Sequence, residues 1–344
     1  MRRVPDPAPH PDDGRTTGTE RDAASVLPAD SSTTAWIRSR RASKIEPDPA
    51  RPIAHFREAE RRLDGSRPVV LHVLLAGAEC PFTCIYCDLW RRTLDGPTPP
   101  GAIARQLEIA LRETGTLPAT CGVKLYNASN FFDPRAVPPG DDASIADLLQ
   151  PFDRVIVECH PRLVGRRCLE FADRIPDRLE VAMGLETADA AALARLNKGM
   201  TLEDFDSAAA RLTSAGIGLR AFVLLPAPFV PAARAVESAL DAVRHAVDRG
   251  ARHVTLIPSR DGNGAMDELR EQGLWTPPAL DLIEEAMESC ARVSGAVVTV
   301  DLWDIDRCLR CRRCRPARIA RLRRFNLTGS PGPPVRCRAC ASSS

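Results

Sequence analysis

Long hydrophobic runs are absent from this chain. No stretch approaches the ~18 consecutive apolar residues that a membrane-spanning helix requires, and the Arg-, Asp- and Pro-rich N-terminus lacks the apolar core of a secretory signal. We therefore expect a soluble protein of the cytoplasm. With 344 residues, 44% hydrophobic and 27% charged, the chain can bury one large core and is neither collagen-like nor wholly disordered.

Acidic residues are missing from one segment. Residues 307–344 contain eleven arginines and no Asp or Glu, so the formal net charge of +2 for the whole chain leaves −9 on the first 306 residues. Lysine is scarce throughout, with three residues against 44 arginines. Concentrated positive charge favours a polyanionic partner, and arginine suits bidentate contacts with phosphate.

Export signals are lacking as well, which bears on the twelve cysteines. Disulfides stabilise small secreted domains, whereas a chain of this length does not need them to fold. We interpret the cysteines as reduced thiols, most of them metal ligands.

Between its ends the sequence alternates between two patterns. Short runs rich in β-branched residues and Leu are followed by Ala-, Leu-, Glu- and Arg-rich segments at helical spacing. The predicted strands are Val69–Leu75, Val123–Tyr126, Arg154–Glu158, Leu179–Leu185, Leu219–Leu225 and His253–Pro258. The predicted helices are Ala102–Arg112, Ile145–Leu149, Cys168–Ile175, Leu202–Ala215, Arg234–Asp248 and Leu280–Ala291. The run Ala296–Asp301 is either a seventh strand or a connection to the tail.

Six successive βα units predict parallel strands, because each helix returns the chain across the sheet in a right-handed crossover. We expect an α/β fold with a partial (β/α)6 TIM-like barrel over residues 67–300, whose active site lies at the carboxyl ends of the strands. Residues 1–32 are expected to be a disordered leader and residues 33–66 a helical extension. Residues 301–344 are expected to form a small Arg- and Cys-rich metal-binding appendage.

Three cysteines stand directly after the first predicted strand, in the segment Cys80-Pro-Phe-Thr-Cys84-Ile-Tyr-Cys87. One loop with three thiolates can hold one face of an iron–sulfur cluster and leave one iron open to a small molecule. A zinc knuckle is the alternative, but structural zinc takes four ligands. No fourth Cys or His follows closely after Cys87.

This C-x3-C-x2-C spacing, with an aromatic residue before the last cysteine, resembles the radical S-adenosylmethionine (SAM) superfamily. The resemblance implies a [4Fe-4S] cluster on Cys80, Cys84 and Cys87, with the methionyl amine and carboxylate of SAM on the fourth iron. It further implies reductive cleavage of SAM to a 5′-deoxyadenosyl radical. The cofactor supplies this chemistry, while the barrel orients the reactants and excludes water.

Segments at the other strand ends resemble the group that contains the catalytic subunit of Elongator, and especially the archaeal enzymes that form archaeosine in tRNA. The resemblance runs from about residue 70 to residue 288. Its segments are Lys124–Pro134, Glu158–Pro161, Gly184–Thr187, Asn197–Thr201 and Pro277–Pro278. The Gly-Gly-Glu that many superfamily members carry after the second strand is absent, which leaves the contact with the SAM amine partly to main chain.

Three candidate SAM-binding residues are uncharged. Asn127 and Ser129, after the second strand, offer polar groups for the ammonium of an amino acid. For Tyr86, the resemblance implies contact with the adenine, and simple loop packing is the alternative.

Three further candidates for SAM binding are charged. Glu158 and Glu186 end the third and fourth strands, where a carboxylate can accept both hydroxyls of a ribose; ion pairs with arginine are the alternative. Lys198 can hold the methionyl carboxylate or a substrate phosphate, or lie solvated at the surface.

Catalytic residues are less sharply indicated. His160 has a pKa range suited to acid–base work, although matching relatives often carry arginine there, and Lys198 is a second candidate. Asn263 is interpreted as a turn residue or a substrate contact. Four cysteines without ligand spacing are expected to be core thiols; these are Cys121, Cys159, Cys168 and Cys290.

The tail adds five cysteines in 33 residues. They are Cys308, Cys311, Cys314, Cys337 and Cys340. Two C-x2-C pairs favour a structural zinc, because an Arg-rich segment has too little apolar surface to fold without a metal. The run C-x2-C-x2-C also suits a second iron–sulfur cluster, so both readings stay open.

Together these features predict a radical SAM enzyme that acts on tRNA or a modified base within it, with RNA docked by the basic tail and a reductant protein as electron donor. The alternative is radical modification of a small molecule or peptide in a biosynthetic pathway, with an auxiliary cluster in the tail. A third hypothesis is a metal-dependent RNA-binding protein without catalytic activity.

Overall fold

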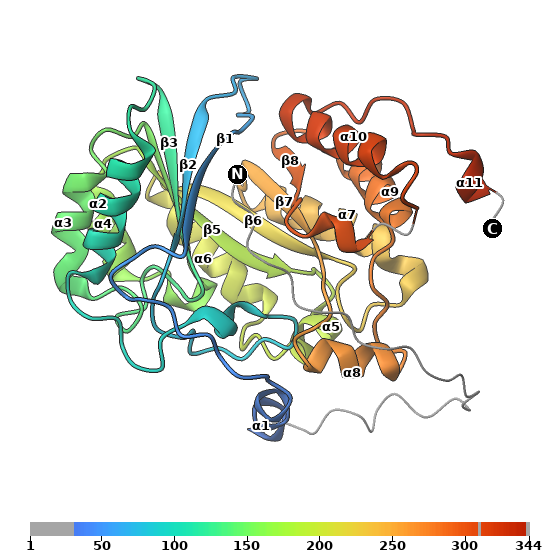
Figure 1. The fold of residues 1–344 in the computed structure, drawn as a ribbon, viewed down its shortest axis with the longest axis horizontal. Helices are drawn as coiled ribbons and strands as arrows, with labels where there is room; N and C mark the ends of the chain where they lie inside the picture. Colours follow the sequence, from blue (N-terminus) through green and yellow to red (C-terminus); the bar gives the residue numbers. More distant parts are fainter. Residues whose placement is uncertain (1–30, 309–310, 342–344) are drawn as a thin grey trace.

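The computed structural model of the chain describes residues 31–308 and 311–341. Its centre is an eight-stranded sheet in sequential order, curled into a half-barrel with helices on the outer face (Figure 1). The first two strands pair antiparallel, and all later neighbours pair parallel. The predicted partial α/β barrel is confirmed.

The strands agree closely with the sequence prediction. They are β1 (Ala54–Ala59), β2 (Val69–Leu75), β3 (Cys121–Asn127), β4 (Arg154–Glu158), β5 (Leu179–Glu186), β6 (Gly218–Leu225), β7 (His253–Pro258) and β8 (Val297–Val300). The run Ala296–Asp301 therefore contains a strand, and the half-barrel has one more parallel strand than the six that were predicted.

Helices separate the parallel strands. The α-helices are α1 (Ser31–Ser39), α2 (Ala102–Thr114), α3 (Asp142–Leu148), α4 (Arg166–Arg174), α5 (Ala190–Arg195), α6 (Leu202–Ser214), α7 (Ala235–Asp248), α8 (Ala265–Glu271), α9 (Leu280–Cys290), α10 (Arg315–Thr328) and α11 (Arg338–Ala341). Short 3-10 turns are η2 (Leu89–Arg92), η3 (Pro139–Asp141), η4 (Pro161–Leu163), η5 (Ala232–Arg234) and η6 (Ile305–Cys308). None of the described helices is both long and apolar enough to span a bilayer.

Residues 33–66 differ from the predicted helical extension. They contain the end of α1 but also β1, which pairs with β2 from Ala54–Leu74 to Ala59–Val69. A six-residue strand has little periodicity of its own, and its partner across the sheet determines its conformation. The predicted disordered leader, residues 1–32, lies outside the described residues up to residue 30, and residues 31 and 32 begin α1.

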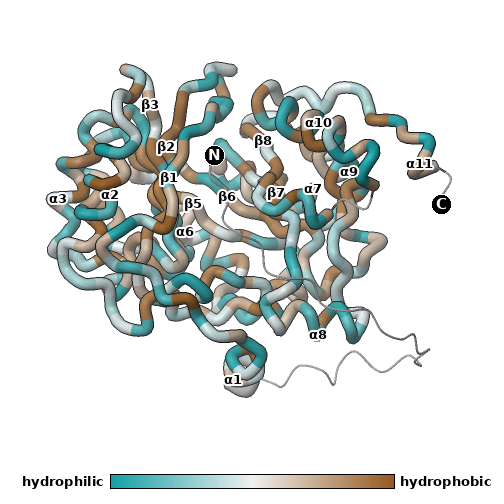
Figure 2. Tube along the Cα trace, viewed as in Figure 1, coloured by the Kyte–Doolittle hydropathy of each residue, from teal (hydrophilic) through white to brown (hydrophobic). Residues whose placement is uncertain are grey.

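The apolar core lies between the sheet and its helices. Hydrophobic residues run along β2 and β3 (Figure 2), where Leu71, Val73 and Leu75 are fully buried. The facing helix α2 contributes Ile103 and Leu107, four residues apart on one side of the helix. This packing holds the carboxyl ends of the strands at one edge of the molecule.

The inner face of the half-barrel holds a network of charges. Arg220 of β6 is 1% exposed and donates to Glu180 of β5 (Nε–Oε1 3.1 Å) and to Glu60, just after β1 (Nη2–Oε1 2.7 Å). Lys124 of β3 also pairs with Glu60. Burial raises the pKa of Glu60, but Arg220 and Lys124 outweigh burial and hold it well below its ordinary value.

This network also joins the two edges of the sheet. Glu60 reaches from the β1 edge to β6, and the neighbouring Arg61 donates to the backbone oxygen of Val298 in β8 (3.2 Å). The hairpin between β1 and β2 thus lies near α10 at the amino end of the half-barrel (Figure 1).

Replacing Glu60 with Gln is expected to destabilise the fold by about 3–5 kcal/mol, because Arg220 and Lys124 would remain buried without their shared carboxylate. Equilibrium urea unfolding measures the change. The matched control is Glu170→Gln, whose carboxylate pairs with Arg166 on the surface of α4 and should change stability by less than about 0.5 kcal/mol. Equal stability of the two variants would show that the network contributes little.

Candidate active site at the carboxyl edge of the sheet

The cysteine loop follows β2 at the carboxyl edge, and Cys80, Cys84 and Cys87 are reduced and partly buried in it. Two residues of the segment after α5 fix its middle. Asn197 donates from Nδ2 to the carbonyl oxygen of Thr83 (2.6 Å), and the backbone nitrogen of Ile85 donates to the oxygen of Leu196 (3.0 Å).

Asn263, in the loop after β7, fixes the far end of the same cysteine loop. Its Nδ2 donates to the backbone oxygens of Ile85 (2.8 Å) and Cys87 (3.2 Å), while its Oδ1 accepts from the backbone nitrogen of Met266 (2.7 Å). The Oδ1 contact agrees with the predicted turn role, whereas the contacts with the cysteine loop were not predicted from the sequence. Asn263 is a positioning residue for the cysteine loop.

The thiols sit in a site that disfavours charge unless a cation is present. Burial raises the pKa of Cys80 to about 11 and also raises the pKa values of Cys84 and Cys87. Metal binding must therefore displace protons from these thiols. Asn130 donates from Nδ2 to the sulfur of Cys80 (3.3 Å), a contact that supports a thiolate.

Asn130 was not singled out from the sequence, although it lies within the segment after β3 that carried the resemblance. Its Oδ1 accepts from the backbone nitrogen of His160 (2.6 Å), so one amide joins the first cysteine to the end of β4. Phe82, between the first two cysteines, stacks on the His160 ring with centroids 3.7 Å apart. No sequence pattern pairs these residues, because their contact depends on the barrel's curvature.

His160 is a buried, neutral ring. Its Nδ1 accepts from the backbone nitrogen of Arg162 (3.2 Å), so Nε2 carries the proton and donates to the backbone oxygen of Lys198 (3.0 Å). Burial lowers the pKa of His160 to about 3, and the nearby Lys198 acts in the same direction. Both nitrogens are occupied in backbone contacts, so acid–base catalysis by His160 would require one of these hydrogen bonds to break.

Glu186 and Lys198 form a buried ion pair. Their Oε1 and Nζ atoms are 2.8 Å apart with both side chains less than 10% exposed, and Nζ lies 3.3 Å from the hydroxyl of Tyr86. Burial lowers the pKa of Lys198, but Glu186 outweighs this and raises it above the ordinary value. Lys198 is therefore a fixed cation in the site, unlike the solvated lysine considered as an alternative.

The backbone conformation near Glu186 leaves room for the ion pair between Glu186 and Lys198. Glu186 adopts φ +68° at a register shift between β5 and β6, a conformation rare for residues other than glycine. A Cβ on Gly184 would overlap the Glu186 carboxylate and lie 2.6 Å from Nζ of Lys198. Gly184 is thus required by the close approach of the ion pair.

The side chains of Asn127 and Ser129 contain buried polar atoms that a polar ligand could satisfy. The Nδ2 and Oδ1 atoms of Asn127 and the hydroxyl of Ser129 are buried without a hydrogen-bond partner in the described protein. Buried polar groups in native proteins are nearly always satisfied. A polar ligand at the carboxyl end of β3 would satisfy them, and an amino-acid ammonium and carboxylate have the chemistry to do so.

Glu158, at the end of β4, is a carboxyl group in a poorly hydrated position. Burial raises its pKa to about 8, and Lys124 and Lys198 only partly offset this. Near neutral pH the group is therefore mainly protonated, so it can both donate and accept a hydrogen bond. This suits neutral hydroxyls such as those of a ribose.

The four cysteines that were expected to be core thiols are all buried: Cys121, Cys159, Cys168 and Cys290.

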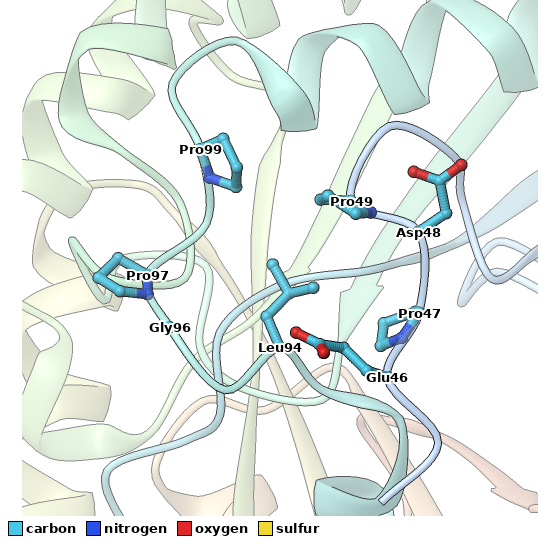
Figure 3. A pocket seen from close by; sticks show the side chains of 8 residues that line it. All are labelled: Glu46, Pro47, Asp48, Pro49, Leu94, Gly96, Pro97 and Pro99. Atoms are coloured by element: carbon cyan, nitrogen blue, oxygen red, sulfur yellow. The ribbon is translucent and has the colours of Figure 1, made fainter.

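A pocket of about 510 Å³ lies between residues 46–49 and 94–99, and prolines form much of its wall (Figure 3). None of the predicted site residues lines it, so we assign it no catalytic role.

Four of the five tail cysteines form one cluster. The sulfurs of Cys311, Cys314, Cys337 and Cys340 lie within 4.8 Å of one another, with Cys311–Cys337 at 4.0 Å and Cys314–Cys340 at 3.6 Å. A tetrahedral zinc with Zn–S bonds of ~2.3 Å separates its sulfurs by about 3.8 Å. The spacing fits one ion, whereas cysteines of an iron–sulfur cluster bind different irons and lie farther apart.

Among the described residues, this cluster contains four of the five predicted tail cysteines and not Cys308, whose role as a ligand stays a prediction. The three cysteines of the C-x2-C-x2-C run do not belong to one structural element. Cys308 ends η6, beside the loop after β7, whereas Cys314 directly precedes α10. The two C-x2-C pairs, Cys311–Cys314 and Cys337–Cys340, each supply two ligand atoms.

The tail's positive charge is partly used within the protein. Arg318 pairs with Asp281 and Glu284 of α9, and Arg321 pairs with Glu284 (3.2 Å) and Glu288. These contacts dock α10 against α9. Seven of the described tail arginines are exposed at the surface: Arg307, Arg312, Arg313, Arg323, Arg324, Arg336 and Arg338.

Replacing Glu158 with Gln is expected to change how stability depends on pH. Since the folded pKa of about 8 exceeds the ordinary 4.5, the wild type should lose stability as pH rises between these values, and Gln should not. The difference in melting temperature, variant minus wild type, should therefore grow from pH 5 to pH 9 in SAM-free protein. The control Glu237→Gln, on the exposed surface of α7, should give a constant difference, and a constant difference for Glu158→Gln would contradict this assignment.

No family model matches the chain. Among curated proteins, it is 25% identical over 265 residues to archaeosine synthase subunit beta of Methanosarcina acetivorans, which spans 74% of this chain and 76% of that protein. It is 30% identical over 148 residues to archaeosine synthase subunit beta of Thermococcus kodakarensis, which spans 41% of this chain and 46% of that protein.

Two solved structures have similar folds. One is Elp3 of Methanocaldococcus infernus, with TM-score 0.47 and 13% identity over 67% of this chain and 56% of that chain. The other is a radical SAM methyltransferase from Sphaerobacter thermophilus, with TM-score 0.48 and 17% identity over 81% of this chain and 83% of that chain. The three-cysteine loop at the carboxyl edge and the similarity to archaeosine synthase subunit beta support the expected resemblance to the radical SAM superfamily, in its Elongator-like and archaeosine-related group.

Proposed function

We propose that this enzyme binds a [4Fe-4S] cluster through Cys80, Cys84 and Cys87 and acts on a nucleoside within tRNA. One observation carries the first part: the cysteine loop lies at the carboxyl edge of the sheet beside buried polar groups of Asn127 and Ser129 that lack partners. When bound, the cluster and SAM supply reductive cleavage to a 5′-deoxyadenosyl radical.

The chain's own residues bind and orient SAM in this proposal. Asn127 and Ser129 accept hydrogen bonds from the ammonium group, and Lys198 attracts the carboxylate. Glu186 keeps Lys198 in place through their 2.8 Å ion pair. Their burial strengthens these electrostatic contacts, because water screens them less than it would at the surface.

Residues of neighbouring elements bind the nucleoside part of SAM in this proposal. Glu158, mainly protonated near neutral pH because burial raises its pKa to about 8, exchanges hydrogen bonds with the ribose hydroxyls. Tyr86 lies between the cysteines and Lys198 and packs against the adenine. His160 acts as a positioning residue, since it links Asn130 to the backbone of Lys198.

The substrate class rests on two supports. The relative that matches 74% of the chain is named as a subunit of an archaeosine synthase, and archaeosine is a modified nucleoside of tRNA. The exposed tail arginines, for example Arg312 and Arg313, offer guanidinium groups to phosphates. A reductant protein is proposed as the source of the electron that reduces the cluster.

The tail cluster separates this function from the alternative of small-molecule or peptide modification with an auxiliary iron–sulfur cluster. Sulfur–sulfur separations of 3.6 and 4.0 Å favour one zinc ion. The zinc would hold α11 against the start of α10 and stabilise a segment that has few apolar residues.

Metal analysis of anaerobically reconstituted protein should give about four irons and one zinc per chain. Cys337→Ser should remove the zinc and keep the iron, whereas Cys84→Ala should lower the iron and keep the zinc. A content of about eight irons, with no zinc, would support the auxiliary-cluster alternative instead.

Activity should depend on the cysteine loop and on RNA. Reconstituted enzyme with dithionite, SAM and bulk tRNA is expected to form 5′-deoxyadenosine and to change the mass of one nucleoside, measured by mass spectrometry of the digested tRNA. Cys84→Ala should lower both products by at least about 1000-fold, and Cys290→Ala, in the core, is the matched control. Formation of 5′-deoxyadenosine without any altered nucleoside would overturn the tRNA part of the proposal.

A further inference from the structure

Trp303 is an exposed indole without an evident structural role. It is 57% exposed, whereas Trp90 and Trp275 are each 3% exposed. Trp36 is partly covered by the guanidinium of Arg40, 4.2 Å from its ring centre. Within the described residues, Trp303 has no stacking or cation contact of this kind. Leaving so large an apolar surface in water is unfavourable, which points to a partner.

The backbone on either side holds this ring in a defined position. The nitrogen of Trp303 donates to Oδ1 of Asp301 (3.1 Å), and its carbonyl oxygen accepts from Nη1 of Arg260 (3.4 Å). Asp304 follows with φ +54°, a left-handed turn. The indole is thus presented by an ordered turn just after β8, at the carboxyl edge of the sheet.

Hydrogen bonds connect this turn to the loop after β7. Arg260 belongs to that loop, and Arg307, just beyond the turn, donates to Asp261 (Nη2–Oδ1 2.8 Å). Arg270 of α8 also pairs with Asp261. Asp261 is therefore neutralised by two cations. Asp304 and Asp306 of the turn are also exposed, so this part of the rim carries charges of both signs, with Arg260 and Arg307 as its guanidinium groups.

The same loop is joined to the cysteine loop. Asn263 donates to the backbone of Cys87 (3.2 Å), and Arg91 of η2 donates to the oxygen of Gly262. In the sequence, Leu89 stands between Cys87 and Arg91, and its side chain is 50% exposed. Leu89 and Trp303 thus lie on two segments that are both hydrogen-bonded to the loop after β7, and this loop also contacts the backbone of Cys87.

We propose that this rim surface, formed by Leu89, Arg260, Trp303 and Arg307, binds the RNA strand next to the nucleoside that reacts. Trp303 stacks on an unpaired base, and the two arginines contact phosphates. A flat aromatic face with adjacent guanidinium groups is the usual means of holding single-stranded RNA. An acidic peptide would satisfy the arginines but would make no specific use of the indole face. The inference rests on the proposed function, because it requires an RNA substrate.

Binding of bulk tRNA to the reconstituted enzyme, measured anaerobically by fluorescence anisotropy at several salt concentrations, tests the surface. Trp303→Ala should weaken binding roughly 5- to 150-fold, the loss that follows from removing one stacked base. Trp303→Phe should retain most of the affinity, because it keeps an aromatic face. Arg307→Gln should lower the slope of log affinity against log salt by about one, as expected for one lost phosphate contact.

Leu63→Ala is the matched control, since Leu63 is 55% exposed but lies in the hairpin between β1 and β2, at the amino end of the sheet (Figure 1). Its affinity for tRNA should equal that of the wild type. Wild-type affinity in Trp303→Ala, with an unchanged melting temperature, would overturn the inference alone. If the wild type forms 5′-deoxyadenosine but neither binds tRNA nor alters a nucleoside, the proposed substrate fails and this surface fails with it.

Discussion

The attachment of the cysteine loop to the neighbouring strand ends is the constraint on which the rest of the site depends. Asn197 and Asn263 each donate to its backbone from different βα loops, and Asn130 reaches the sulfur of Cys80. Three thiols on an unsupported loop would sample many arrangements, and ordering them on metal binding would cost conformational entropy. Here residues that follow three different strands hold the loop through hydrogen bonds, as expected for a preorganised site.

Charge inside the half-barrel is arranged in two layers with different tasks. At the amino end, Arg220 and Lys124 share the carboxylate of Glu60, and every charge has an opposite partner. This layer lies beside the contact of Arg61 with β8 that joins the two edges of the open half-barrel. At the carboxyl end, Lys198 has its partner in Glu186, but Asn127 and Ser129 do not have theirs. The unpaired amide and hydroxyl at the carboxyl end are therefore available to a polar ligand.

Much of this could be predicted from the sequence. Parallel strands follow from the alternation of β-branched and helical segments, and three predicted strands have the observed bounds, because buried strands in such folds are continuous apolar runs. Strand β1 was missed since its six residues depend on β2 for their conformation. Cys308 lies outside the cluster of the other four tail cysteines among the described residues, and spacing in sequence does not show that η6 ends at this residue. The contacts of Asn130, Phe82 and His160 depend on loops from three strands meeting, which one-dimensional patterns do not encode.

The account's central claim is that the loop of Cys80, Cys84 and Cys87 holds an iron–sulfur cluster with one iron open to SAM. Electron paramagnetic resonance of the anaerobically purified, dithionite-reduced protein tests it most directly, with and without SAM. We expect the signal of a reduced [4Fe-4S] cluster that changes on addition of SAM and is absent in Cys84→Ala. A loop that holds zinc, or a cluster signal that SAM leaves unchanged, would contradict the account.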